Sequence, residues 1–221
     1  SPLATAGSAA PHNNAATCQE TEDCNHGTHV TGIAAGRSSA AVALQGVSPD
    51  ANIIPVQVFS YGDNAQVSGA FAADVFAALD AVRDNTAAGT NENPFVVNMS
   101  LGGGLFAADC ANVSVAVTNA IQDLTDRGIP VVVSTGNEFD KTQIGWPACV
   151  PNTIKVSAVT DNGSSLPGFA NIGNPASFTG PILTAPGETI ESAGIASNTD
   201  TDTVSGTSQA APHVAGLYAA I

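Results

Sequence analysis

The chain has 221 residues, 43% of them hydrophobic, which is enough for one α/β domain with a sizeable core. Five basic residues stand against nineteen acidic ones, so the formal net charge is −14. Nucleic acids and anionic membranes are bound through basic patches, and a composition this acidic excludes both as expected partners. No apolar run is long enough to predict a membrane-spanning helix.

Several segments of the chain are predicted to be strands. Residues 52–59 predict the first one, and Pro55 favours an edge or irregular position for it. Three later segments are short and continuously apolar, as parallel strands buried on both faces tend to be: 95–99, 130–135 and 153–160.

Two helices are expected between these strands. Apolar residues recur there with helical spacing, at Phe71, Val75, Ala78, Leu79 and Val82 and again at Val113, Val117, Ala120, Ile121 and Leu124. The alternation predicts an α/β fold with a doubly wound, mostly parallel sheet and helices on both faces. The polar, glycine-rich stretches 161–180 and 194–204 are expected to be surface loops.

The most informative segment is 204–216, Val-Ser-Gly-Thr-Ser-Gln-Ala-Ala-Pro-His-Val-Ala-Gly. It places Ser208 at the start of a helix, just after Gly206, which lets the backbone turn tightly. The helix N-terminus offers unpaired N–H groups and a positive dipole end, where an oxyanion can be stabilised. Pro212 is expected in the first turn, where its missing N–H has no partner. A serine in such a place is most often only a helix cap, so other motifs must decide.

Three other motifs complete the set. Residues 25–36 begin a helix at His26, residues 95–103 run from a strand into glycines, and residues 128–138 end a strand near Asn137. A base, a nucleophile and an amide donor at the ends of elements are what acyl transfer requires. In this order the four motifs resemble those of the subtilisin-like serine protease family (subtilases), from about Asn25 to Gly216.

The resemblance implies a role for each residue of the chemistry. Ser208 is expected to be the nucleophile and His26 the general base and acid. Asn137 is expected to donate to the oxyanion together with the backbone N–H of Ser208. The segment that pairs antiparallel with the substrate backbone is expected to be Ser100, Leu101 and Gly102.

The resemblance also implies a pocket for the residue before the cut bond. One wall is expected to be Ser134, Thr135 and Gly136. Gly145 leaves the floor open, which predicts a preference for large apolar side chains. Glu138 at the rim would let the pocket tolerate basic side chains. The alternative, that Glu138 is only a solvated loop carboxylate, is weighted equally.

One expected part of the family pattern is missing. The triad aspartate lies in this family on an early strand ending Asp-Thr-Gly or Asp-Ser-Gly, and nothing before His26 matches. Asp23 is too near in sequence to reach the far ring nitrogen. Residues 1–221 are therefore expected to be a single peptidase domain that lacks the N-terminal strand and, because Ile221 closely follows the serine helix, the C-terminal end. Without the aspartate, turnover should fall about 10⁴-fold, a magnitude taken from serine proteases that include this family.

The four cysteines favour an exported chain. The resemblance implies the disulfides Cys18–Cys24 and Cys110–Cys149, although four cysteines allow three pairings. A zinc site built from Cys24, His26 and His29 is the competing interpretation.

No metal is predicted. Calcium is known in the family, but residues 37–42 carry no cluster of acidic or amide ligands, and Asp200 and Asp202 are expected in a solvated loop.

The function expected from these residues is a monomeric serine endopeptidase, secreted or periplasmic, that cuts proteins or peptides through an acyl-enzyme. An N-terminal propeptide would accompany it. One alternative is an inactive homologue that serves as a binding or scaffold module. Another is a hydrolase on an unrelated α/β fold, which would place its serine in Gly-x-Ser-x-Gly and its histidine last.

Overall fold

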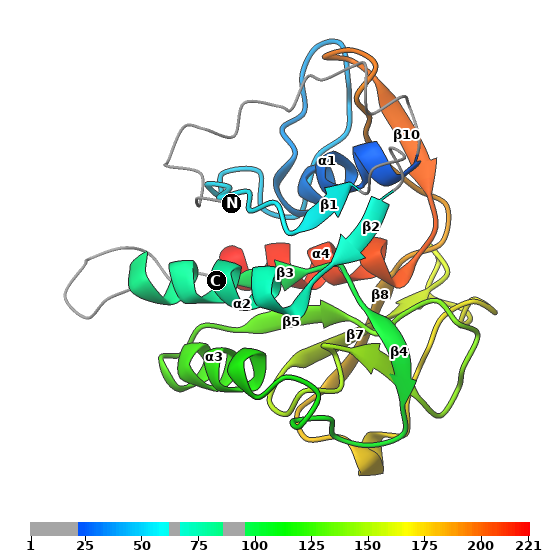
Figure 1. The fold of residues 1–221 in the computed structure, drawn as a ribbon. Coiled ribbons are helices and arrows are strands. Elements are labelled where there is room, and N and C mark those ends of the chain that lie inside the picture. The colour runs from blue at the N-terminus through cyan, green and yellow to red at the C-terminus, as the bar shows by residue number, and fades with distance from the viewer. Residues whose placement is uncertain (1–21, 62–66, 86–95) are drawn as a thin grey trace.

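A computed structural model describes residues 22–61, 67–85 and 96–221. Its centre is a four-stranded parallel sheet in the order β3-β5-β7-β8. The strands are β3 (Val97–Met99), β5 (Val131–Ser134), β7 (Ile154–Val159) and β8 (Ile182–Pro186). Helices lie on both sides of the sheet (Figure 1). The predicted α/β class with a mostly parallel sheet is confirmed.

Four helices form the outer layers: α1 (Glu22–Ala35), α2 (Ala72–Asn85), α3 (Val115–Asp126) and α4 (Thr207–Ala219). The side chains of the fully buried β5 show which helices cover each face of the sheet, because successive strand side chains point to opposite faces. Val131 and Val133 join a core shared with α2 and α3. Val132 joins a second core shared with α4, against which α1 packs in turn.

Three antiparallel pairs surround the sheet. They are β1 (Phe59–Tyr61) with β2 (Val67–Ala70), β4 (Gly103–Phe106) with β6 (Ile144–Trp146), and β9 (Ile190–Ala193) with β10 (Thr201–Val204). A short 3₁₀ helix, η1, covers Pro175–Ser177.

The expected first strand, 52–59, is wrong in most of its length. Only Phe59 belongs to a strand, and Ile54 is 63% exposed. An extended segment becomes a strand only where a neighbour pairs with its backbone, and the described residues place no strand beside 52–58.

The three later strands agree with the prediction within two residues, and both helical faces are largely correct. Buried positions of these faces include Val75, Leu79, Val117, Ile121 and Leu124. Phe71 and Val113 precede the helices and are 60% and 47% exposed.

The expected loops contain more structure than predicted. Residues 201–204 form β10, because they pair with β9 in a regular antiparallel register. The 161–180 stretch holds η1 and the buried side chains of Asn171 and Phe178. Loop residues can be buried when side-chain and backbone partners satisfy their polar groups.

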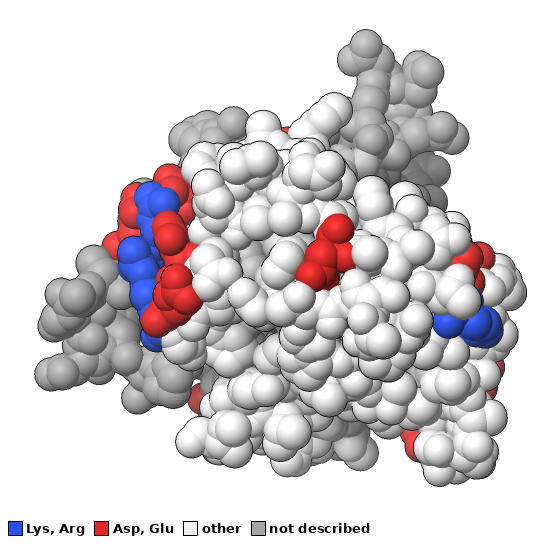
Figure 2. Space-filling view, turned by 90° about the horizontal axis from the view of Figure 1, so that it is seen from below, with Lys and Arg blue, Asp and Glu red and all other residues white. Residues whose placement is uncertain are grey.

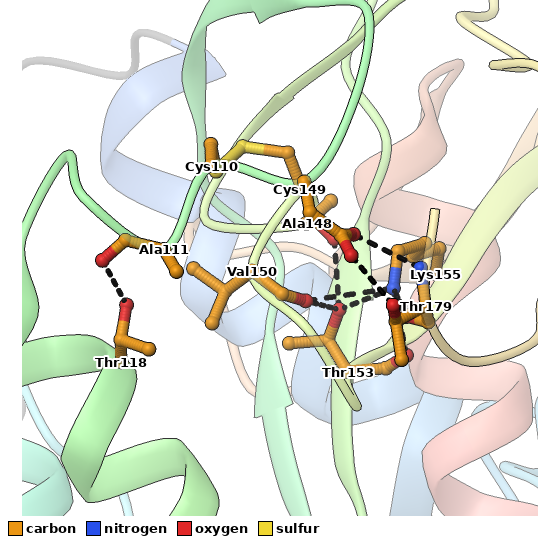
Figure 3. The surroundings of a disulfide bond; sticks show 10 residues. Cys110, Ala111, Thr118, Ala148, Cys149, Val150, Thr153, Lys155 and Thr179 are labelled. Atoms are coloured by element: carbon orange, nitrogen blue, oxygen red, sulfur yellow. Dashed lines mark hydrogen bonds between the residues drawn. A yellow bond between two sulfur atoms is a disulfide. The ribbon is translucent and has the colours of Figure 1, made fainter. Parts of the chain in front are cut away.

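The predicted disulfide Cys110–Cys149 is present, with the two Cα atoms 5.3 Å apart (Figure 3). It links the segment before α3 to the segment after β6. The second predicted bond, Cys18–Cys24, lies outside the described residues because Cys18 precedes residue 22.

Near the disulfide, the side chain of Lys155 is completely buried at the amino end of β7 (Figure 3). Its ammonium lies within 2.7 Å of Thr179 O, 3.0 Å of Thr153 Oγ1, 3.1 Å of Thr153 O and 3.5 Å of Val150 O. Burial lowers the pKa of Lys155 to about 8 because the ammonium is desolvated, and the charge of Asp109 opposes this shift.

Lys155 should make stability depend on pH in the alkaline range. Between pH about 8 and 10.5 the folded protein has lost a proton that the unfolded chain still binds, so the free energy of unfolding should rise with pH. Urea unfolding at pH 7 and pH 10 measures this effect. Between these pH values the free energy of unfolding of the wild type should rise by about 2 to 3 kcal/mol more than that of Lys155→Met. An unchanged difference between the two proteins would mean that the buried ammonium keeps its ordinary pKa.

Candidate active site

Three of the four predicted motifs, those at 95–103, 128–138 and 204–216, meet at the carboxyl ends of β3 and β5. The two strands are parallel, with Met99 opposite Val133, so Ser100 and Ser134 emerge at the same edge of the sheet. Helix α4 begins beside this edge, because Thr207 contacts Asn137. Ligands of open α/β sheets bind outside the carboxyl ends of strands.

The contact between Thr207 and Asn137 is a double one. The Oδ1 atom of Asn137 accepts from the backbone N–H of Thr207 at 2.9 Å and from its hydroxyl at 3.0 Å. The Thr207 hydroxyl oxygen in turn accepts from Gly136 N at 3.0 Å. These bonds use the amide oxygen, so the Nδ2 donor of Asn137 is directed away from Thr207.

The Asn137 donor and the start of α4 flank a common point. A Cβ atom added to Gly206 would lie 2.7 Å from Gln209 Oε1, 3.3 Å from Asn137 Nδ2 and 3.7 Å from Ser208 N. Two N–H donors therefore lie near one point in front of the helix, and the Gln209 side-chain oxygen lies beside the same point. This arrangement suits an oxygen that carries negative charge.

Two helix boundaries differ from the predictions. His26 is the fifth residue of α1 and does not begin it. Pro212 is the sixth residue of α4, so it lies in the second turn, where its missing N–H removes one intrahelical bond. Both His26 and Ser208 are half-buried, and their helices α1 and α4 pack together.

His29, one of the two histidines of the alternative zinc site, has other hydrogen-bond partners. His29 is fully buried, and its Nε2 lies 3.1 Å from both Ile190 O and Asp202 O. Asp202 is not in a solvated loop as expected, because it lies in β10 and its carboxylate accepts from the side chain of Asn25.

No group of three His, Cys, Asp or Glu side chains that could hold a metal ion occurs in 22–61, 67–85 and 96–221. In the loop after α1, where the family pattern has calcium, Arg37 donates to Pro49 O at 2.6 Å and pairs with Asp50. A guanidinium held in this loop does not fit a cation site.

The predicted pocket residues come together around a buried asparagine that sequence reasoning missed. The backbone O of Asn171 accepts from Thr135 Oγ1 at 2.6 Å, and its Oδ1 accepts from the N–H groups of Glu138 and Asp140, each at 3.0 Å. Its Nδ2 donates to Thr135 O and to the carboxylate of Glu138. Glu138 is exposed and its carboxylate accepts from Asn171, and its effect on substrate preference stays a prediction. An isolated Asn in a polar stretch carries no sequence signal for this role.

The pocket segment lies against the segment predicted to bind substrate. Gly103 pairs with Trp146, and Gly145 N donates to Thr135 O at 2.8 Å. Ser134, Thr135 and Gly145 are buried, whereas Gly136 is only half-buried.

Charged side chains are few, and the basic atoms on the face in Figure 2 lie beside acidic ones. Among the described residues, Arg83 pairs with Asp80, Asp84 and Asp123. Helices α1 to α4, all those in the described part of the chain, are too short or too polar to cross a membrane.

Comparisons with known proteins give one consistent result. A family model described as "Subtilase family" matches residues 7–221. Alkaline protease 1 of Emericella nidulans is 35% identical over 204 residues, which cover 92% of this chain and 44% of that protein. The extracellular serine proteinase of a Thermus species is 36% identical over 199 residues, covering 90% and 41%. The chain thus spans less than half the length of these relatives.

Solved structures agree with the sequence matches. A cold-adapted subtilisin-like serine proteinase has a TM-score of 0.64 and 31% identity, covering 88% of this chain and 60% of its own. The prenylagaramide maturation protease PagA has a TM-score of 0.70 and 27% identity, covering 88% and 63%.

Replacing Gly136 with alanine should destabilise the protein more than the same change at an unconfined glycine. Its φ is +105°, and an added Cβ would lie 2.5 Å from Glu138 Oε2 and 2.6 Å from Asn171 Nδ2. Gly128 also has a positive φ, +79°, but open space around its Cβ position. Urea unfolding should show a loss of about 1 kcal/mol for Gly128→Ala, from backbone strain alone, and at least about 1 kcal/mol more for Gly136→Ala. Equal losses would show that the contacts of Asn171 do not confine this position.

Proposed function

This chain belongs to the subtilase family of serine proteases, and on that premise we propose that the protein is a serine endopeptidase that works through an acyl-enzyme. Ser208 is the nucleophile, His26 is the general base and acid, and Asn137 with the Ser208 N–H forms the oxyanion hole. The observation that carries the proposal is the pair of hydrogen bonds that Asn137 Oδ1 accepts from Thr207, with Asn137 Nδ2 and Ser208 N both within 3.7 Å of the Cβ position of Gly206.

The reaction follows from these positions. Ser208 Oγ attacks the peptide carbonyl carbon, and its proton passes to His26 while negative charge develops on the carbonyl oxygen. Asn137 Nδ2 and the Ser208 N–H stabilise that oxygen at the positive end of α4. The intermediate then expels the amine, which takes its proton from His26. Water, deprotonated by His26, cleaves the resulting ester and restores the Ser208 hydroxyl.

Substrate binding uses the edge formed by Ser100, Leu101 and Gly102. The backbone of this segment pairs with the peptide, because it leaves the carboxyl end of β3 next to α4. The side chain before the cut bond enters beside Gly136 and Gly145. Gly145 has no side chain to fill that space, so the pocket favours large apolar residues, whereas Glu138 and Asn171 close the Cβ position of Gly136.

The acid that orients His26 belongs, in this proposal, to an N-terminal strand encoded upstream of Ser1. Asp23, the aspartate nearest before His26, lies in the same helix, α1. An apolar strand ending in Asp-Thr-Gly or Asp-Ser-Gly in the upstream gene sequence supports this arrangement. A different residue at that place would favour the inactive homologue, which serves as a binding module.

Export fits the same proposal. The disulfide Cys110–Cys149 persists in oxidising surroundings such as the periplasm or the extracellular space. One relative is an extracellular proteinase by name. We propose a secreted or periplasmic protease, made with a propeptide and acting as a monomer.

Replacing Asn137 should slow the chemistry and leave binding almost unchanged. In the protein expressed from its complete gene, Asn137→Leu should lower kcat by 10²- to 10³-fold with little change in KM, because the donor acts only on the developing oxyanion. That range comes from an enzyme of this same family. Peptide hydrolysis rates and a sulfonyl fluoride that labels Ser208 provide the measurement.

Asn162→Ala is the matched control, because Asn162 lies in an exposed turn, where its Oδ1 accepts from the neighbouring Thr160 hydroxyl and Ser164 N–H. Its kcat should equal that of the wild type. If Asn137→Leu kept full kcat, or if a Ser208→Ala variant still cut peptides, the proposed roles would be wrong.

The pocket can be tested by adding one methyl group. A Cβ at Gly145 would meet its nearest neighbours at 3.5 Å, an ordinary contact, so Gly145→Ala should fold normally. On peptides that differ only in the residue before the cut bond, the wild type should prefer phenylalanine and leucine to alanine. Gly145→Ala should lower the ratio of kcat/KM for phenylalanine over alanine about tenfold, because the methyl shortens the pocket. An unchanged preference, or a wild type that favours small or acidic residues, would contradict the assignment.

A further inference from the structure

Pro212 leaves one carbonyl of helix α4 without its usual donor. In an α-helix the N–H of residue i donates to the C=O of residue i−4, so an N–H at position 212 would donate to the C=O of Ser208. Pro212 has no N–H and lies in the second turn, well inside the hydrogen-bonded part of the helix. The carbonyl without this partner belongs to the nucleophile itself.

A side chain from the sheet takes the place of the missing N–H. The hydroxyl of Ser100, just beyond β3, donates to Ser208 O at 2.7 Å. Ser100 is 9% exposed, so little water competes for the carbonyl.

The direction of this hydroxyl is set by a second bond. Asn98 Nδ2 donates to Ser100 Oγ at 3.0 Å. A serine oxygen that already accepts from an N–H keeps its single proton for another partner. The chain of donors therefore runs from Asn98 through Ser100 to the Ser208 carbonyl.

We propose that the Ser100 hydroxyl is a positioning group for Ser208, replacing the N–H that Pro212 removes and holding the nucleophile against the segment that binds substrate. The inference rests on the proposed function of Ser208. It gives Ser100 a side-chain role in addition to the backbone pairing expected for residues 100–102.

This bond links substrate binding to the geometry of the reacting atoms. A peptide paired with residues 100–102 lies on the segment that carries Ser100, and Ser100 holds the peptide group after Ser208. The orientation of that group sets the backbone angles of Ser208, and thereby where its Oγ points relative to Asn137. Loss of the hydroxyl should therefore slow the chemical step more than it weakens binding.

Pro212→Ala provides a direct test, because alanine restores the N–H that would donate to Ser208 O. We would compare wild type, Ser100→Ala, Pro212→Ala and the double variant, all expressed from the complete gene. Ser100→Ala should lower kcat and the rate of Ser208 labelling by a sulfonyl fluoride about five- to tenfold, with KM changed less than twofold. The double variant should recover most of this loss, and Pro212→Ala alone should stay within about twofold of the wild type.

Two controls separate positioning from general destabilisation. Ser100→Thr keeps a hydroxyl and should retain most of the activity. Thr153→Val removes a buried hydroxyl that donates to Ala148 O at 2.8 Å, at the opposite end of the sheet, and should lower stability without changing kcat. Equal kcat values for Ser100→Ala and wild type, or a double variant no better than Ser100→Ala, would overturn the proposal.

The contact can also be measured without activity. Urea unfolding of the same four proteins should show Pro212→Ala stabilising the Ser100→Ala background more than the wild-type background. If the wild type neither cuts peptides nor reacts with the sulfonyl fluoride, the proposed function fails, while this unfolding cycle still decides whether Ser100 serves the Ser208 carbonyl. Strictly additive changes in stability would contradict the contact.

Discussion

The parallel pairing of β3 with β5 is the constraint on which the rest of the site depends. Parallel strands end on the same side, so Ser100 and Ser134 leave the sheet together. Helix α4 crosses that edge with its N-terminus beside Asn137, because its apolar residues Ala210 and Ala211 are fully buried in the core on one face of the sheet. The nucleophile, the amide donor and the substrate segment are thus brought together by the same packing that buries the core.

Hydrogen bonds to backbone carbonyls and amide side chains fix loops of this protein where more highly charged proteins use ion pairs. Only 11% of the residues are charged. Lys155 donates to oxygens of Val150, Thr153 and Thr179, and Lys141 donates to the carbonyls of Pro167, Gly168 and Ala170. Asn171 joins Thr135, Glu138 and Asp140 in the same manner. Directional hydrogen bonds of this kind hold loops in a defined shape with little dependence on salt.

The sequence predicts candidate site residues where local chemistry is decisive. The glycine before Ser208, the small residues behind it and the strand that ends near Asn137 follow from backbone geometry and periodicity. The strand at 52–59 could not be judged in this way, because a strand needs a partner and the partner is a property of the fold. The prediction for Pro212 differs by one turn from the structure for a related reason. The helix begins at Thr207, and nothing local marks that start to within one turn.

The sequence by itself determined the α/β class, the order of the main elements and the residue types available for chemistry, because periodicity and turn residues act over short distances. Only the tertiary structure decided three sets of hydrogen bonds. Thr207 donates to Asn137, Asn171 accepts from Glu138 and Asp140 at the pocket edge, and Ser100 donates to the carbonyl of Ser208. Each of these bonds joins residues from 31 to 108 positions apart. No spacing rule reaches that far, since such contacts exist only once the sheet and its helices have packed.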